Sequence, residues 1–551
     1  MVLVIRVSLL SSVLVVNFLL PRLARAETLY VSPSGSDSNA GSESAPFATL
    51  TRAQTSASPG DTVLVRGGHY TFVSDTVVNG VLLDKSGQAG KPIEYRAYPN
   101  ELPVLDFSGL TAKQRLTGIR VTASYVQVKG LELKGVFQRI NTENESWGVY
   151  NTGSHNIYES LHIHDIQGPG LFIAQGSDNQ VLQCDSYNNY DPMSKAGPGE
   201  NADGFGCHSS GGNNVFRGCR AWWNSDDGYD FISAKGTCLV EYSWAFWNGF
   251  LPNSQTPSGN GNGFKAGGYG TGTVPDSPPR HTVRFCVAVG NRAAGFYANH
   301  HPIGGDWFDN SAYQNARDFD MLLLAPGGIA NHVLHNNLSY GSKSPLANYT
   351  GGDDSFNSWK LSVTVSDADF EGLDLEDLQS PRKNDGSLPD VPLLHLKSDS
   401  DLIDKGTDIG FAFQGAAPDL GAFELGSVYH AEPDAEGDAG AGAAAPSSSD
   451  AGATPAARDA SAATQPSSSK PDASVQTSSG TARSDAGAQS ADASPPREGP
   501  EQDPNASGVG SVPHHGGCTL GRSPSSETAL APLALLLAGV VLRRPKTLRR
   551  A

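Results

Sequence analysis

The sequence is short of positive charge, with 39 Lys and Arg residues against 57 Asp and Glu residues in 551 positions. The formal net charge of −18 at pH 7 argues against a nucleic-acid partner, because phosphate binding needs clustered basic side chains. Long stretches with an apolar residue at every third or fourth position are also missing, which argues against a helical fold. The histidines lack cysteine or carboxylate partners at zinc-binding spacings, so no zinc centre is expected.

Cysteine is scarce as well, with six residues in the chain. Cys184, Cys219 and Cys286 fall at equivalent positions of a repeat that is described below. A Cys184–Cys219 disulfide and a stack of free core thiols both remain open, because an exported protein can form such a bond but does not need to.

The two ends of the chain carry its longest apolar runs. Residues 1–26 combine a sparse basic start, an apolar stretch through Leu20 and the small residues Ala24 and Ala26, which predicts a cleaved secretory signal. The run from Leu530 to Leu542 has 13 residues, which is short for a stable membrane span.

Composition divides the rest of the chain into three parts. We predict a folded domain over 27–426, a disordered linker rich in Ala, Ser, Asp, Gly and Pro over 427–515, and a sorting or anchor segment over 516–551. In that last segment Cys518 precedes the short apolar run and an arginine cluster, an order that resembles the C-terminal sorting signals of the myxobacterial type. The resemblance implies an extracellular protein attached to the cell surface, with membrane contact only through the tail. A simple, weak membrane anchor is the alternative.

A short phrase recurs in the middle of the chain. Asp203-Gly204-Phe205 returns as Asp227-Gly228-Tyr229 after 24 residues, and reduced forms follow at Gly263-Phe264 and Gly295-Phe296. A fixed period of this size is typical of a solenoid. The residues between the repeats alternate Val, Ile, Leu, Phe and Cys with polar residues, which predicts short strands. We therefore predict an all-β fold, a right-handed parallel β-helix of roughly eight to ten turns.

Other side chains are given structural positions by the same repeat. We expect an asparagine ladder from four residues that open equivalent strands, namely Asn156, Asn179, Asn214 and Asn331. For most of the nearby large aromatic residues we expect packing in the core or between turns, because inward aromatic stacks fill the lumen of a coil; a platform that stacks with sugars is the alternative. These residues are Trp222, Trp223, Trp244, Trp247 and Tyr229. Residues 361–425 are less regular and are predicted to pack across the coil as a cap.

Acidic residues cluster in the repeated phrase. Equivalent positions on successive turns lie ~4.8 Å apart, so Asp203 should stack on Asp227, with Asp226 and Asp230 on the same turn as Asp227. Lys265 falls in the column of Asp230. Four carboxylates repel one another at this separation, so either they splay apart or a cation lies among them. Ligands that are all oxygen favour calcium over zinc.

Three blocks of sequence contain these residues: Asn201-Ala202-Asp203-Gly204-Phe205, Asn224-Ser225-Asp226-Asp227-Gly228-Tyr229-Asp230 and Gly261-Asn262-Gly263-Phe264-Lys265. The three blocks resemble the signatures of polysaccharide lyase family 9, the calcium-dependent pectate lyases. The resemblance extends over roughly residues 27–425. It implies that Asp203, Asp226, Asp227 and Asp230 bind Ca²⁺, and that Lys265 is the general base of a β-elimination.

The resemblance implies an anionic polysaccharide as the partner, polygalacturonate first, and we expect a monomer. A bound calcium ion would hold an anionic sugar against an acidic protein. Two alternatives remain open: a lyase of the same fold that acts on another uronate polymer, and a noncatalytic, calcium-stabilised adhesin that binds glycan. A hydrolase is disfavoured, because glycoside hydrolysis uses a pair of carboxyl groups and no lysine base.

Overall fold

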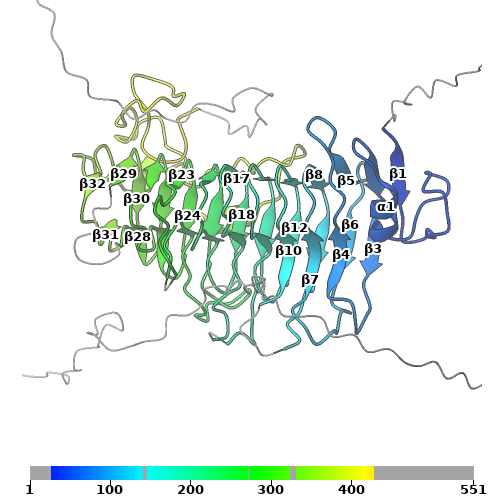
Figure 1. Cartoon of the computed structure of the whole chain (residues 1–551). Coiled ribbons are helices and arrows are strands. Elements are labelled where there is room, and N and C mark those ends of the chain that lie inside the picture. Colours follow the sequence, from blue (N-terminus) through cyan, green and yellow to red (C-terminus); the bar gives the residue numbers. More distant parts are fainter. Residues whose placement is uncertain (1–25, 141–144, 196, 271, 323–330, 427–551) are drawn as a thin grey trace, which may run out of the picture. The chain divides into compact units, whose positions relative to one another are not determined.

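The computed structural model describes residues 26–140, 145–195, 197–270, 272–322 and 331–426. Within these ranges the chain winds as a coil in which each turn contributes one strand to each of three parallel sheets (Figure 1). The two shorter sheets contain 10 strands each, so the coil has ten complete turns. The predicted all-β parallel β-helix is confirmed. The linker 427–515, the tail 516–551 and all but the last residue of the signal 1–26 lie outside the described residues.

The first sheet contains 12 strands: β1 (Thr28–Val31), β2 (Thr62–Val65), β5 (Ile93–Ala97), β8 (Val126–Lys129), β11 (Ile157–Glu159), β14 (Gln180–Leu182), β17 (Asn214–Arg217), β20 (Cys238–Glu241), β23 (Thr282–Arg284), β26 (Asp306–Phe308), β29 (His332–His335) and β32 (Gly352–Asp353). The second sheet contains β3 (Gly68–Thr71), β6 (Pro103–Asp106), β9 (Glu132–Lys134), β12 (His162–His164), β15 (Asp185–Tyr187), β18 (Arg220–Trp222), β21 (Trp244–Phe246), β24 (Val287–Val289), β27 (Ser311–Tyr313) and β30 (Leu338–Tyr340). The third sheet contains β4 (Asn79–Leu83), β7 (Thr117–Val121), β10 (Trp147–Asn151), β13 (Leu171–Ile173), β16 (Phe205–Cys207), β19 (Tyr229–Asp230), β22 (Phe264–Lys265), β25 (Ala294–Tyr297), β28 (Arg317–Asp320) and β31 (Leu346–Ala347).

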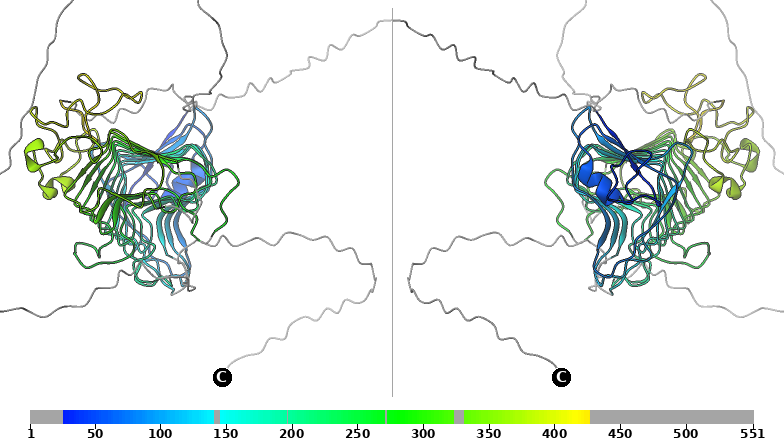
Figure 2. Two further views of the ribbon diagram at one scale, coloured as in Figure 1. Left: turned by 90° about the vertical axis from the view of Figure 1, so that its left-hand side faces the viewer. Right: turned by 90° about the vertical axis from the view of Figure 1, so that its right-hand side faces the viewer.

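Helices are short in the described part of the chain. The helix α1 (Leu50–Ser56) starts at Thr49, whose side chain accepts a hydrogen bond from the amide of Arg52. It packs against β1 and β4 and so covers the N-terminal end of the coil (Figure 2). Two 3₁₀ turns, η1 (Asp367–Asp369) and η2 (Leu375–Gln379), belong to the segment after the last strand. No helix among the described residues is long and apolar enough to cross a membrane.

The lumen of the coil is filled by stacked side chains. Five aromatic rings on the inner face of the third sheet follow one another at centroid distances of 5.1, 4.7, 5.1 and 4.7 Å, in the order Phe205, Tyr229, Phe264, Phe296 and Phe319. These separations are close to the spacing of hydrogen-bonded strands, so ring stacking and strand pairing support the same register.

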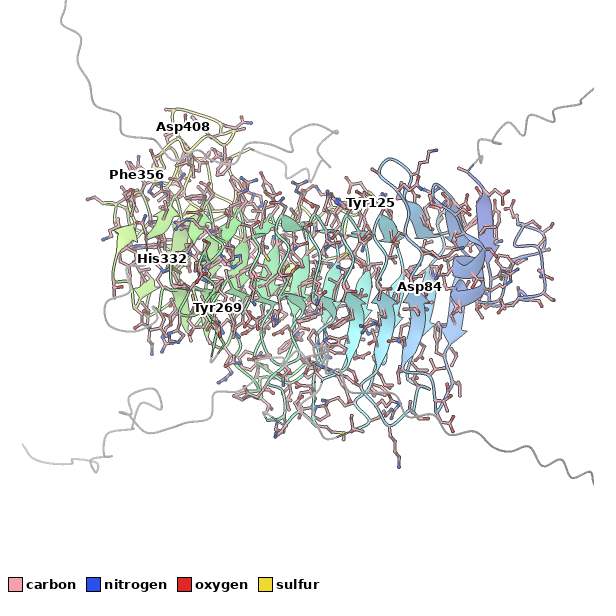
Figure 3. The ribbon with its side chains drawn as sticks, in the orientation of Figure 1. Asp84, Tyr125, Tyr269, His332, Phe356 and Asp408 are labelled. Carbon is pink, nitrogen blue, oxygen red and sulfur yellow. The ribbon has the colours of Figure 1, made fainter. Side chains whose placement is uncertain are left out.

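The predicted asparagine ladder is present over three of its four residues. The backbone amide of Asn156 donates to the side chain of Asn179 at 3.0 Å, and that of Asn179 donates to Asn214 at 3.1 Å. The prediction was wrong for Asn331, which is exposed. The pairing of Asp306 with Val333 puts His332 in that column instead, and its Nδ1 accepts from the amide of Gly305 at 3.1 Å. Figure 3 shows His332 among the C-terminal turns.

A second, longer ladder joins the second sheet to the third and was not predicted. Each side-chain amide donates to the side-chain oxygen one turn further on, at 2.8, 3.0, 3.0 and 2.9 Å, through Asn189, Asn224, Asn248, Asn291 and Asn315. All five are buried. Because buried amides are costly to leave unpaired, this ladder fixes the turn that precedes each strand of the third sheet.

Four tryptophans pack in an apolar core, as expected for most of these aromatic residues, but this core lies outside the lumen. Trp222 and Trp244 project from the outer face of the second sheet, because Ala221 and Ala245 take the inward positions and neighbouring side chains alternate. Trp223 and Trp247 join them in an apolar cluster with residues of the C-terminal segment. Of the five aromatic residues considered, only Tyr229 belongs to the lumen.

The segment 361–425 packs across the coil, as predicted, and it does so over this outer face of the second sheet (Figure 2). Two buried guanidinium groups attach it. Arg382 lies 2.6 Å from Asp185 Oδ1, and Arg220 lies 2.8 Å from Asp185 Oδ2 and donates to the Ser380 carbonyl. Burial alone would raise the pKa of Asp185, but the two cations hold it well below its usual range.

The cysteine column is present as the repeat implied. Cys184 and Cys219 precede the paired residues Asp185 and Arg220, and Cys286 lies two turns beyond Cys219. All three thiols are free and buried. Of the two possibilities left open by the sequence, the structure contains the stack of core thiols.

We expect Asn248→Ala to destabilise the coil, because Asn248 both accepts from Asn224 and donates to Asn291. The loss should be about 1–3 kcal/mol for each buried group left unpaired. It would be measured as a lower midpoint of urea unfolding. Asn331→Ala is the matched control and should leave the midpoint unchanged, since Asn331 is exposed. Equal effects of the two substitutions would contradict a stabilising ladder.

Candidate active site

The repeated glycines allow the turns of the third sheet to stack closely. A Cβ atom on Gly204, Gly228 or Gly263 would lie 2.7, 2.6 or 2.6 Å from the carbonyl oxygen of the next turn. Such distances are too short for a side chain, so only glycine fits this column. The close stacking fixes the residue that precedes each glycine at the edge of the sheet. Asp203 and Asp227 occupy this position before Gly204 and Gly228.

Three of the four predicted carboxylates meet at this edge. Oxygen atoms of Asp203, Asp227 and Asp230 lie within 4.8 Å of one another. Asp203 Oδ1 also accepts from the backbone amide of Asp227 at 3.1 Å, and Asp230 Oδ1 accepts from that of Ile232 at 2.7 Å. These backbone donors orient the carboxylates toward one another.

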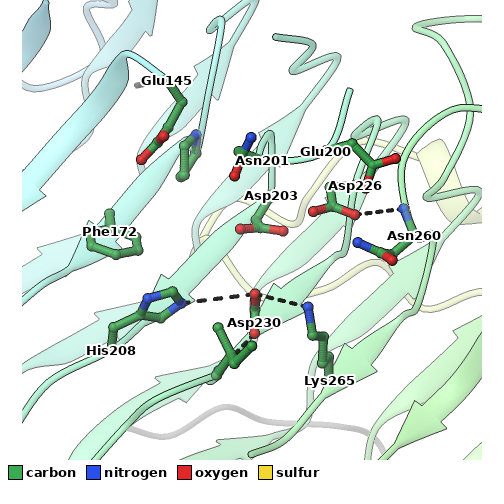
Figure 4. Close-up of a pocket in the computed structure, with 12 residues that line it drawn as sticks. Glu145, Phe172, Glu200, Asn201, Asp203, His208, Asp226, Asp230, Asn260 and Lys265 are labelled. Carbon is green, nitrogen blue, oxygen red and sulfur yellow. Dashed lines mark hydrogen bonds and ion pairs between the residues drawn. The ribbon is translucent and has the colours of Figure 1, made fainter. Parts of the chain in front are cut away.

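Asp226 stands beside this group and lines the same open pocket as Asp203 and Asp230, with about 470 Å³ of empty space (Figure 4). Its Oδ1 accepts from the amide of Asn260 at 2.7 Å. Asp227 is fully buried, and Asn262 holds its Oδ1 through two hydrogen bonds of 2.7 and 2.9 Å. We call Asp203, Asp226, Asp227 and Asp230 the acidic cluster.

Lys265 reaches into the acidic cluster from the next turn. Strand pairing joins Asp230 to Lys265 and Lys265 to Tyr297, in the columns that the repeat predicted. The ammonium nitrogen lies 2.9 Å from Asp227 Oδ2, an ion pair without hydrogen-bond geometry, and it donates to Asp230 Oδ2 at 3.2 Å. Only 8 % of the residue is exposed, so it is not a solvated surface lysine.

The electrostatic environment of the cluster is unfavourable to four ionised carboxylates. Burial raises the pKa values of Asp203 and Asp226 well above the usual range, and neighbouring carboxylates raise them further. For Asp227, burial raises the pKa more than Lys265 lowers it. Burial tends to lower the pKa of Lys265, but the surrounding carboxylates together raise it well above its usual value.

The donor set suits a calcium ion. Four carboxylates face a single lysine, so the buried charge is uncompensated when all are ionised, and the ligand atoms that the acidic cluster offers are all oxygen. Calcium binds several oxygen ligands and tolerates irregular geometry, whereas zinc selects nitrogen and sulfur. The residues present therefore fit the metal that the sequence suggested.

Sequence reasoning missed several residues of the pocket. His208 Nε2 lies 3.9 Å from Asp230 Oδ2, and the ring of His208 meets that of Phe172 edge to face at 4.7 Å. Phe172 leans over Gly206, where a Cβ would come within 2.5 Å of the ring. A glycine in the outward column beside Asp230 was the available signal for a large neighbour, but the sequence did not show which side chain filled the space.

Stacked carboxylates and a buried lysine on the flank of a parallel β-helix define a polysaccharide-lyase type of site. The comparisons with known proteins identify the family. Residues 29–337 match the Pel9A-like, right-handed β-helix region, and the chain belongs to this family. The right-handed sense of the coil agrees with the prediction.

Individual relatives agree with the family. Over 402 residues the chain is 36 % identical to pectate lyase L of Dickeya chrysanthemi. The alignment covers 72 % of this chain and 90 % of that protein. The crystal structure of pectate lyase Pel9A superposes with a TM-score of 0.64 at 34 % identity, over 72 % of this chain and 96 % of that one. A solved structure titled rhamnogalacturonan lyase superposes with a TM-score of 0.65 at 36 % identity, over 68 % of this chain and 97 % of that one. The protein is a polysaccharide lyase of the pectate lyase type.

The raised carboxyl pKa values predict how metal-free stability depends on pH. Above about pH 4, where unfolded aspartates are ionised, the folded cluster still binds protons, so its contribution to stability falls as pH rises. Asp203→Asn removes one of these groups and the repulsion it causes. In chelator, the unfolding midpoint of Asp203→Asn should therefore rise relative to that of the parent when the two proteins are compared at increasing pH from about pH 4 to pH 7.

The matched control is Asp276→Asn, because Asp276 is exposed. Its midpoint should follow that of the parent at every pH. A constant difference between Asp203→Asn and the parent across this pH window would contradict a buried, proton-binding cluster.

Proposed function

We propose that this protein is a calcium-dependent pectate lyase that cleaves polygalacturonate by β-elimination. The observation that carries the proposal is the contact of Lys265 with two carboxylates of the acidic cluster, at 2.9 and 3.2 Å, at an open pocket. The relatives that are named pectate lyases support the choice of substrate. The alternative of a noncatalytic adhesin is set aside, because the similar proteins and structures that are described above are named as lyases.

Each residue has a chemical task in this proposal. Asp203, Asp226, Asp227 and Asp230 hold Ca²⁺, which would supply a Lewis acid for the uronate carboxylate as negative charge develops on it. Lys265, in its neutral form, takes the proton from carbon-5 of the sugar. The electrons of that carbon–hydrogen bond form the carbon-4 to carbon-5 double bond. The glycosidic oxygen leaves carbon-4 with the electrons of the bond that breaks and takes up a proton from water to become a hydroxyl group of the departing chain.

The protonation of Lys265 sets the pH dependence. The carboxylates that surround it raise its pKa, so the neutral form is rare at neutral pH in the absence of a compensating cation. Occupation of the cluster by a divalent cation offsets the charge of these carboxylates. Activity should accordingly require the metal and increase toward alkaline pH.

A lyase for rhamnogalacturonan is the second candidate. The solved structure with that title is as similar to this chain, by identity and TM-score, as pectate lyase Pel9A. Loops at the pocket, and not the acidic cluster, would then select the sugar, as in a lyase for another uronate polymer. The two candidates share the chemistry and differ in the polymer.

We further propose that the enzyme acts as a monomer outside the cytoplasm. The sequence of residues 1–26 supports export, and the order of Cys518, apolar run and arginine cluster in 516–551 supports attachment to the cell surface. An extracellular location suits a substrate that is too large to enter a cell.

Lys265→Ala should lower the rate of polygalacturonate cleavage by a factor of about 10²–10⁴, the usual contribution of a general base. Cleavage is measured by the ultraviolet absorbance of the unsaturated product. Lys265→Arg keeps the positive charge but supplies no base at ordinary pH, so it should be inactive as well. Chelator should abolish the activity of the parent, and calcium should restore it.

Lys235→Ala is the control for this experiment, since Lys235 is exposed just beyond β19. It should retain full activity. Product formation by Lys265→Ala at the rate of the parent would exclude Lys265 as the base. Absorbance from rhamnogalacturonan, but none from polygalacturonate, would favour the second candidate.

Export predicts a mature protein that begins at Glu27 and is absent from the cytoplasm. N-terminal sequencing of the cell-surface fraction would test this. Replacement of Ala24 and Ala26 by large residues should block cleavage, because signal peptidases require small side chains there. A full-length cytoplasmic protein that retains Met1 would refute the proposed export.

A further inference from the structure

The outer face of the third sheet continues well beyond the acidic cluster toward the N-terminus. Strand pairing defines one column of outward side chains along the coil, one for each turn. In order from the N-terminal side, the column contains Leu82, Arg120, Tyr150, Phe172, Gly206, Asp230, Lys265, Tyr297 and Asp320. We call it the outer column. The residues on either side of each of these in sequence point into the coil.

The N-terminal half of the outer column is cationic and aromatic. The guanidinium of Arg120 lies over the ring of Tyr150, 4.7 Å from its centroid. The rings of Tyr150 and Phe172 are nearly parallel, 25° apart, with centroids 5.8 Å from each other. The ring centroid of Trp147, the first residue of β10, lies 4.4 Å from that of Tyr150. A continuous strip therefore leads from Arg120 to Phe172, next to the acidic cluster.

The pocket at the acidic cluster opens in this direction. Its lining extends over five turns, from Glu145, Pro169 and Phe172 on the N-terminal side to Asn260 and Lys265. In Figure 4 Phe172 and His208 lie on the side of Asp230 opposite to Lys265. The strip is thus an extension of the site and not a separate surface.

The charges of the strip distinguish Arg120 from its neighbours. Arg115 forms an ion pair with Glu145 and also lies 3.5 Å over the ring of Trp147. Arg120 has no carboxylate within ion-pair distance among the described residues, and it is partly exposed. An arginine that contacts only an aromatic face keeps its hydrogen-bond donors available for a carboxylate from outside.

We propose that Arg120, Tyr150 and Phe172 form a binding subsite for a uronate residue of the same polymer chain that reaches the acidic cluster. The apolar face of a sugar packs on Tyr150 and Phe172, and the carboxylate of the sugar beyond it binds Arg120. Four turns of ~4.8 Å separate Arg120 from Asp230, about 19 Å, so several sugars of one chain span the distance. This inference rests on the proposed function, because it takes the substrate to be an anionic polysaccharide.

The subsite solves an electrostatic difficulty of the enzyme. A polyanion that approaches a protein of net charge −18 is repelled over most of the surface. Arg120 offers the polymer a cationic contact away from the acidic cluster. The aromatic rings beside Arg120 can stack with charged and neutral sugars alike. The subsite therefore favours long, de-esterified chains over short or neutral ones.

Binding measured without turnover tests this inference. In the full-length Lys265→Ala protein with calcium present, calorimetry compares short oligogalacturonates, which reach only the acidic cluster, with oligomers long enough to reach Arg120. Arg120→Gln should weaken binding of the long oligomer by a factor of about 10 to 100 and reduce its salt dependence. Tyr150→Ala should weaken it by about 3- to 10-fold with the salt dependence unchanged.

Binding of the short oligomer should be unaltered in both variants. The matched control is Arg96→Gln, since Arg96 is a half-exposed arginine on β5 of the first sheet. Unchanged binding of the long oligomer in Arg120→Gln, or equal losses for short and long oligomers, would overturn the subsite.

The outcome also separates this inference from the proposed substrate. If the protein binds neither oligogalacturonate, polygalacturonate fails as the substrate, and the same variants with long and short rhamnogalacturonan oligomers decide the subsite by the same criteria. If the long oligomer binds through Arg120 but the parent enzyme forms no unsaturated product from it, the result supports the subsite and contradicts the proposed β-elimination.

Discussion

The pairing of parallel strands at a fixed spacing is the constraint on which the rest of the structure depends. Because each turn of the coil is hydrogen-bonded to the next in register, residues far apart in sequence become neighbours in columns. Asp230 and Lys265 are separated by 35 positions but are paired residues of adjacent strands. The same register brings together the aromatic stack in the lumen, the asparagine ladders and the acidic cluster. An insertion within a strand of the third sheet would move the side chains of that strand to the opposite face, whereas an insertion in a loop between strands would not.

The folded protein tolerates the acidic cluster because hydrogen bonds, one lysine and a ladder of buried amides support it. Backbone amides hold individual carboxylate oxygens, Lys265 supplies one positive charge, and the Asn189 to Asn315 ladder fixes the turns that present Asp203 and Asp227. Buried like charges oppose folding, so the stability must come from the stacked core and the paired amides. This is a familiar division in enzymes, where a rigid scaffold supports an electrostatically strained site.

The repeat made much of the fold and of the candidate site predictable. A glycine with no space for a side chain, followed by an inward aromatic residue, marks the register unambiguously, so the columns of Asp203, Asp230 and Lys265 could be written from the sequence. Positions without such a marker could not. Asn331 was assigned one residue out of register, because histidine at position 332 can accept the same backbone hydrogen bond. The face on which the tryptophans pack could not be predicted, since the sequence does not reveal that residues 361–425 cover the second sheet. Arg120, Tyr150 and Phe172 belong to turns that precede the recognisable motif, and only the strand pairing connects them to it.

The attachment of the C-terminal segment has a consequence for the order in which the protein can mature. Arg382 follows its partner Asp185 by 197 residues, so the middle turns of the coil emerge during synthesis long before the residues that cover them. Until then, the outer tryptophans of the second sheet and the carboxylate of Asp185 face solvent or another protein. A chain that stops short of residue 382 would keep its wound turns but present a broad apolar flank, a surface prone to association. Residues 361–425 thus remove from solvent an apolar flank that the turns of the coil alone would expose.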